Sequence, residues 1–162
     1  MIVIGEGING TIAEDARASL DEVIDQLRAE GRLEAGQETT HETLKWTTET
    51  IRAAGDFEKT VNLKPLETLG VTTGQGNMKG NIKWTGPIVY HDVLPDPPTY
   101  QQIAPGYEVI GILALGTLQL PEIGESGKKE ISSGSVAYFR GSDPVVYRSC
   151  GGGRGILFYI SI

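Results

Sequence analysis

The residues best placed to bind a ligand through the backbone lie near the N-terminus. Gly5-Glu-Gly-Ile-Asn-Gly10 follows a short apolar run and precedes a helical pattern. In dinucleotide-binding proteins, glycines at this spacing let a pyrophosphate approach the N-terminus of a helix. Such a unit also needs a second apolar strand after the helix, whereas residues 31–40 contain no apolar run. We therefore interpret the motif as a glycine-rich turn into a capped helix and expect no cofactor, with nucleotide binding as an alternative.

Side chains suited to metal binding or to nucleophilic catalysis are few. The chain contains two histidines, His41 and His91, and one cysteine, Cys150. A metal site needs three or more convergent ligands, and the adjacent His91 and Asp92 would face opposite sides of a strand. A nucleophilic Cys150 would need a base beside it, and no Ser-His-Asp set or P-loop is present. The sequence therefore predicts neither a metal site nor catalytic residues.

Aromatic and arginine residues in strand-like segments form a candidate binding patch. Its members are Trp84, Tyr107, Tyr138, Arg140, Tyr147 and Arg148. On neighbouring strands, these side chains would offer aromatic faces and guanidinium groups to an anion or a small molecule, and Arg154 is a further candidate. Exposed strand residues and ring-stacking pairs explain the same residues equally well.

The elements that must position these residues begin with two helices. Thr11-Ile-Ala-Glu14 matches a capping box, and apolar residues at helical spacing follow it, so we predict a helix over residues 12–30. A second Thr-x-x-Glu start, Thr39-Thr-His-Glu42, predicts a helix over residues 40–54.

Short apolar segments separated by glycine-rich turns follow the helices and predict a β body. The predicted strands cover residues 81–84, 87–90, 107–120, 128–132, 135–140, 144–149 and 155–162, and residues 1–4 add one at the N-terminus. Strands at this close spacing are typical of a sandwich or a barrel. The run Ile156–Ile160 is apolar on both faces, which predicts a central strand.

The C-terminal half resembles a cupin or a related jelly roll. Residues 108–120 are similar to the first conserved strand pair of cupins with its central glycine, and residues 131–139 resemble the later glycine turn into a strand. Residues 143–147 stand where cupins usually have Pro-His. Cupin enzymes hold a metal through histidines and a carboxylate at these places, whereas this chain offers only Glu108 and Val145. The resemblance therefore implies a jelly-roll β-sandwich without the metal ligands.

The negative charge is concentrated in the N-terminal part of the chain. Residues 1–60 contain 13 acidic and 6 basic residues, and residues 61–162 contain 8 of each. This distribution disfavours nucleic-acid binding, which needs a basic face. It suits either a solvated helix face or docking onto a basic partner surface. With no apolar run of membrane-spanning length and no basic leader, we expect no membrane span, no secretory signal, and a location in the cell or in a virion.

Together these observations predict a mainly β, α+β fold of one structural unit. Residues 1–60 are expected to form a strand and an acidic arm of two short helices, and residues 61–162 a glycine-rich β-sandwich. The predicted function is that of a non-enzymatic structural or interaction protein without metal or cofactor. Its best specific form is a homo-oligomer, such as a trimer, within a larger protein assembly, for example a phage capsid decoration or head-surface component. The alternative is a metal-independent cupin-like enzyme or a small-molecule or sugar-binding module.

Overall fold

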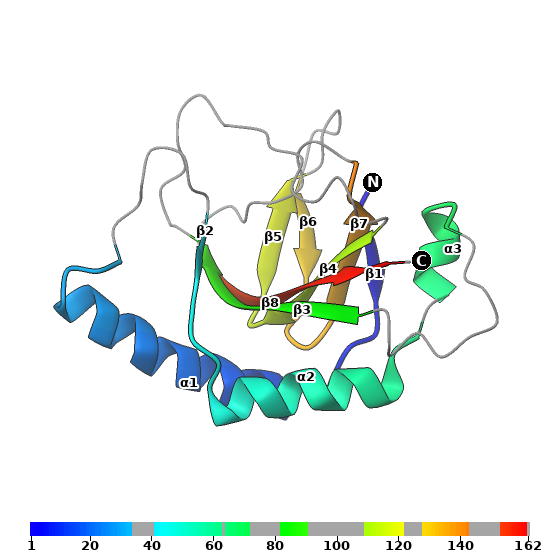
Figure 1. The fold of residues 1–162 in the computed structure, drawn as a ribbon. Coiled ribbons are helices and arrows are strands. Elements are labelled where there is room, and N and C mark those ends of the chain that lie inside the picture. The colour runs from blue at the N-terminus through cyan, green and yellow to red at the C-terminus, as the bar shows by residue number, and fades with distance from the viewer. Residues whose placement is uncertain are drawn as a thin grey trace.

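A six-stranded antiparallel sheet forms the centre of the computed structural model, with two helices on one face and a two-stranded sheet on the other (Figure 1). The structure describes residues 1–33, 41–62, 64–71, 82–90, 109–121, 128–142 and 153–161. The strand order of the large sheet is β1-β7-β4-β8-β3-β2. Its strands are β1 (Val3–Gly5), β2 (His41–Thr43), β3 (Ile82–Tyr90), β4 (Val109–Leu115), β7 (Val136–Arg140) and β8 (Gly153–Ile160). The fold is α+β and rich in antiparallel sheet, as the sequence predicted.

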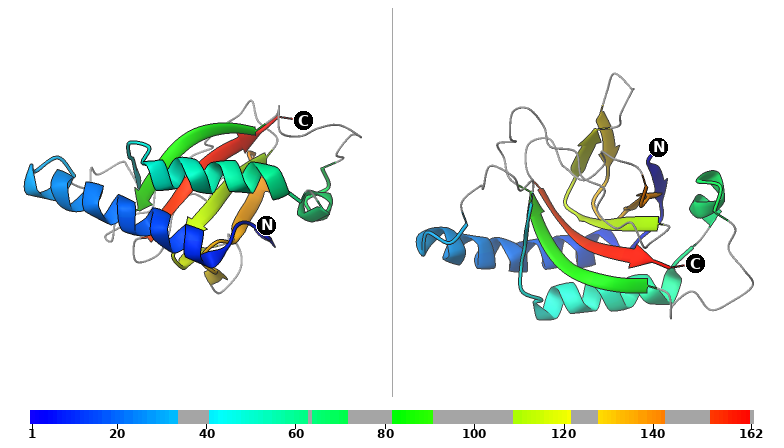
Figure 2. Two further views of the ribbon diagram at one scale, coloured as in Figure 1. Left: turned by 90° about the horizontal axis from the view of Figure 1, so that it is seen from below. Right: turned by 45° about the horizontal axis from the view of Figure 1, so that its top comes forward.

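Helices α1 (Gly10–Ala29) and α2 (Thr48–Thr60) lie side by side across one face of this sheet (Figure 2). Their apolar sides share one core with the sheet, because small and branched residues recur at helical spacing. The buried helical members are Ala13, Ala16, Leu20, Ile24, Ala53 and Phe57, and sheet members include Leu113, Val136, Tyr138, Ile156 and Phe158. The predicted acidic helical segment therefore packs on the sheet of its own chain.

The opposite face of the sheet is covered by β5 (Leu118–Pro121) and β6 (Lys128–Ile131), which pair with each other. A second apolar cluster fills the space between the two sheets. Its members include Ile2, Ile88, Tyr90, Ile110, Ile112, Leu118, Leu120, Ile131, Phe139 and Leu157. The large sheet is thus buried on both faces, which explains why all seven residues of β4 are buried.

Strand β8 confirms the predicted central position of the last apolar run. It pairs with β4 on one side and with β3 on the other. A central strand with apolar cores on both faces needs apolar residues at successive positions. This accounts for the continuous Ile156–Ile160 run, in which alternate side chains enter different cores.

The first helix begins two residues before the predicted start. Asn9 is the N-cap, and its side-chain oxygen accepts a hydrogen bond from the Thr11 amide at 2.8 Å. The predicted box between Thr11 and Glu14 is wrong, because the Glu14 carboxylate instead accepts a hydrogen bond from Ser133.

The predicted helix over residues 40–54 is also displaced in the structure. Residues 41–43 form β2, which pairs with β3 through His41–Tyr90 and Thr43–Ile88. The helix begins at Thr48 and continues to Thr60, and its capping box joins Thr47 to Thr50. The β-branched threonines suit an edge strand as well as a cap, and the pairing with β3 decides between them.

A short third helix, α3 (Lys64–Thr68), lies beside β1 in a segment for which we predicted no helix or strand. Its Leu66 side chain is fully buried in the helix-side core. Of the predicted strands, residues 144–149 lie outside the described part of the chain. Among the helices that the structure describes, none is long and apolar enough to cross a membrane.

Candidate functional site

The N-terminal glycine motif is used for close packing. The Ile8 amide donates a hydrogen bond to the Gly134 carbonyl at 2.7 Å. A Cβ atom on Gly7 would overlap this same carbonyl oxygen, and one on Gly5 would lie 2.9 Å from the ring of Tyr138. Strand β1 pairs antiparallel with β7, so the motif does not sit in a parallel βαβ unit within the described residues. This arrangement fits the interpretation of the motif as a turn into a capped helix.

Three members of the predicted binding patch, Tyr107, Tyr147 and Arg148, lie outside the described residues, as do His91, Asp92, Glu108, Val145 and Cys150. The rings of Trp84 and Tyr138 both contact the ring of Phe158. The Trp84 centroid lies 4.9 Å and the Tyr138 centroid 6.2 Å from the Phe158 centroid. Tyr138 is fully buried, and its hydroxyl has no hydrogen-bond partner among the described residues. Burial raises the pKa of Tyr138 above its ordinary value, so it is a neutral core side chain.

Two arginine candidates hold separate parts of the fold. The Arg140 Nε donates to the Leu69 carbonyl at 2.7 Å, next to the end of α3. Arg154 lies at the other end of the sheet, because β4 pairs Val109 with Arg140 and Leu115 with Arg154. These two guanidinium groups therefore do not share a patch.

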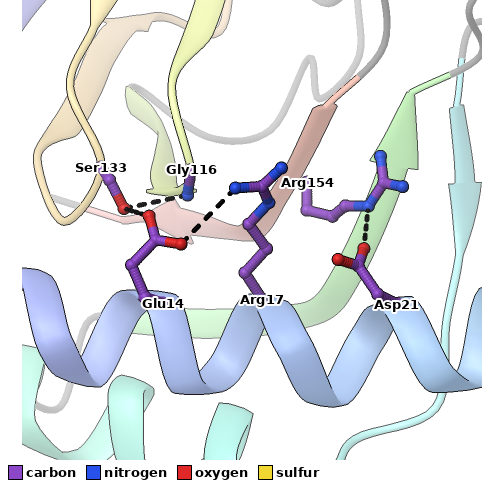
Figure 3. Close-up of polar contacts among 6 residues, drawn as sticks. All are labelled: Glu14, Arg17, Asp21, Gly116, Ser133 and Arg154. Atoms are coloured by element: carbon purple, nitrogen blue, oxygen red, sulfur yellow. Dashed lines mark hydrogen bonds and ion pairs between the residues drawn. The ribbon is translucent and has the colours of Figure 1, made fainter.

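A row of polar contacts fixes α1 against the loops and strands above it (Figure 3). The Arg154 Nε donates to Asp21 at 2.8 Å, with the arginine side chain only 19% exposed. The Ser133 hydroxyl donates to Glu14 at 2.9 Å and accepts from the Gly116 amide at 3.0 Å, while Arg17 pairs with the other Glu14 oxygen at 3.5 Å. Both carboxylates thus already have protein partners, which indicates a role in positioning the helix.

The described residues form an open groove where α2 meets β3, beside a β-bulge. The register between β3 and β8 shifts between Trp84 and Gly86. Residues 84 and 88 would share a face of a regular strand, but here Trp84 joins the helix-side core and Ile88 the opposite core. The extra residue of a β-bulge changes the face of the sheet toward which the following side chains point. Gly86 has φ 145°, and a Cβ atom there would lie 3.8 Å from the Trp46 indole nitrogen.

The groove has a volume of about 420 Å³ and is lined mainly by apolar atoms. Its lining residues are Trp46, Ile51, Ala54, Gly55, Glu58 and Trp84. The Trp46 and Trp84 rings meet nearly edge to face, with centroids 6.3 Å apart and planes at 81°. Trp46 is 38% exposed and Ile51 59% exposed, so two large apolar side chains border the opening.

Trp84 and Glu58 are held in place within the lining of the groove. The Trp84 ring packs on Phe57 and Phe158, with centroids 5.8 and 4.9 Å away. Its indole N–H donates to the Glu58 carboxylate at 2.5 Å. The site therefore combines aromatic walls with one carboxylate, which suits the binding of an apolar group that has a positive end.

Sequence reasoning selected Trp84 but missed the rest of this groove. Ile51 lies on α2, within the predicted helix over residues 40–54 but not named as a site residue, and Trp46 lies in the connection before α2. A signal for Trp46 depends on knowing that Thr47 is the N-cap, because an apolar residue directly before an N-cap often packs against one in the first turn of the helix. Within the described residues, no group of three or more potential metal ligands is found.

Comparisons with known proteins add little to this picture. No protein-family model matches the chain, and no curated protein matches it. A solved structure of a prolyl-4-hydroxylase from Pseudomonas putida aligns with 99% of this chain and 92% of its own, at 13% identity and a TM-score of 0.46. A score and an identity this low support no conclusion about fold family or activity.

Proposed function

We propose that this protein is a non-enzymatic interaction protein that binds a positively charged segment of a partner protein, with the groove between α2 and β3 as its anchor site. The observation that carries this proposal is the pair of exposed apolar side chains, Trp46 and Ile51, at the mouth of the groove. Exposed apolar patches next to polar residues are typical of interaction sites. Tryptophan is also one of the residue types enriched among those that dominate binding energy.

The charge of the helix layer supports a basic partner. Helices α1 and α2 together contain eight acidic and four basic residues. These helices form the outer layer on their side of the sheet (Figure 2), so a partner that reaches the groove meets this surface. Complementary charge raises the association rate and disfavours partners of the same sign. The net negative layer therefore favours a lysine- or arginine-rich segment.

The test of the proposed function is selection from a random peptide library on the folded protein alone, followed by affinity measurements of the selected peptides on the native protein and on the Trp46→Ala variant. Peptides that contain lysine or arginine should be enriched, and Trp46→Ala should weaken their binding by about tenfold, as expected for loss of an aromatic anchor. Arg52→Ala is the matched control, since Arg52 is an exposed residue of the same helix that does not line the groove. Peptides that bind Trp46→Ala as tightly as the native protein would refute the proposal.

We further propose a jelly-roll-like body and, as the specific role, an oligomeric virion component such as a capsid decoration. The pairing of a six-stranded with a two-stranded sheet across an apolar layer supports the first part. The oligomer is tested by size-exclusion chromatography with light scattering, which should give a trimer or larger. A strict monomer at all concentrations would contradict the assembly role but leave peptide binding intact.

A second candidate is a sugar-binding or small-molecule module that uses the same groove. The exposed Trp46 face and the Glu58 carboxylate favour it, because sugars stack on aromatic rings and donate hydrogen bonds to carboxylates. Titration with neutral oligosaccharides separates the two candidates. A saccharide that binds in a Trp46-dependent way, when no peptide does, would favour this module.

A further inference from the structure

We infer that the groove receives the cationic end of a side chain, with Glu58 as the counter-ion and the two indoles as walls. This inference rests on the proposed function, because the side chain would belong to the basic partner segment. It deepens that function by naming the chemical group that enters the site and the residues that recognise its charge.

The Glu58 carboxylate is placed to receive a positive charge. It is half-buried, and one of its oxygens accepts the indole N–H of Trp84. Within the described part of the chain, no basic side chain pairs with Glu58, and the adjacent Lys59 instead pairs with Asp56 at 3.7 Å. Apolar surroundings strengthen the attraction between a carboxylate and a cation, so a cation in the groove would gain more here than beside a fully exposed acid.

The two indoles add a second attraction for a cation. Both rings line the groove together with Glu58, and their planes meet at 81°. A cation over the face of a tryptophan ring is attracted by the ring quadrupole, and tryptophan is the strongest of the aromatic residues in this respect. Trp84 is held by Phe57, Phe158 and Glu58, so one wall is already ordered before binding. An ordered wall reduces the entropy lost when the ligand binds.

The probe for this inference is choline, compared with its neutral carbon analogue 3,3-dimethylbutan-1-ol. The two molecules have the same shape and differ in charge. The chain has two tryptophans, so two indole N–H signals report on the groove in a proton–nitrogen NMR spectrum. Choline should shift both signals, and the neutral analogue should bind about tenfold more weakly, since it lacks the charge that the carboxylate and the indole rings attract.

Two charge-neutralising variants separate recognition at the groove from general attraction. Glu58→Gln keeps an oxygen that can accept the Trp84 N–H, and it should weaken choline binding by about tenfold. Glu49→Gln removes the same charge from an exposed position in the first turn of α2, outside the groove, and should change binding little. Equal binding of choline and its neutral analogue, or equal effects of the two variants, would overturn the inference. If selected peptides bind through Trp46 while choline fails these tests, the proposed function stands and only the inference falls.

Discussion

Phe158→Ala is expected to lower the free energy of unfolding by about 3–5 kcal/mol, the range for removal of a fully buried phenylalanine. Phe158 lies on the central strand β8 and is fully buried. Its ring centroid is 5.1 Å from that of Phe57 on α2 and 4.9 Å from that of Trp84 on β3. One side chain thus joins the helix layer to the sheet, and its loss leaves a cavity that rigid neighbours cannot fill.

Gly111, opposite Phe158 on β4, makes this prediction more specific. A Cβ atom at Gly111 would overlap the Phe158 ring. Gly111→Ala alone should therefore destabilise the fold by about 2 kcal/mol through overpacking. In a protein that already carries Phe158→Ala, the ring that the new Cβ atom would overlap is absent. Gly111→Ala should then lower the free energy of unfolding much less. Chemical denaturation of the four proteins measures this coupling, and additive effects would show that the two residues do not compete for the same space.

The hydrophobic pattern of the sequence predicted correctly those elements in which each face has the same burial from one end to the other. Helix α1 has buried residues at helical spacing from Ala13 to Ile24, and this stripe appears directly in the sequence. The continuous apolar character of β8 reflects burial on both faces. In both elements the hydrophobic pattern alone specifies how the element packs.

The boundaries between strand and helix in residues 40–60 could not be obtained in the same way. Thr39-Thr-His-Glu42 matches a helix start signal, whereas the structure caps α2 at Thr47 and Thr50. Residues 41–43 form a strand instead of a helix because β2 pairs with β3, whose residues lie almost fifty positions further along the chain. Tertiary pairing overrides local propensity in such short segments.

The groove depends on still less predictable features. Trp84 and Ile88 face different cores because the register shifts before Gly86, and the sequence pattern does not show this shift. The remaining lining residues are contributed by α2 and the connection before it. A site built from a bulge, a loop and a helix appears only when the three are brought together, so the sequence could supply Trp84 as a candidate but not its neighbours.

Gly7→Ala is expected to lower the free energy of unfolding by about 3 kcal/mol, at the upper end of the usual cost of overpacking. A Cβ atom there would overlap the carbonyl oxygen of Gly134, the group that accepts the Ile8 amide. Backbone cannot rotate away as a side chain can, so the turn between β1 and α1 must separate from the turn before β7. Thermal or chemical denaturation measures the loss.

Gly10→Ala is the matched control within the same motif. A Cβ atom at Gly10 meets no atom within 4 Å, and the residue is the first of α1. Alanine restricts the unfolded chain more than glycine and suits a helix, so this variant should be neutral or up to about 0.5 kcal/mol more stable. If the glycines served a phosphate group, both changes would mainly affect ligand binding and leave the unfolding free energy similar. A large difference in stability between the two variants would instead identify Gly7 as a packing residue, and equal stabilities would contradict that assignment.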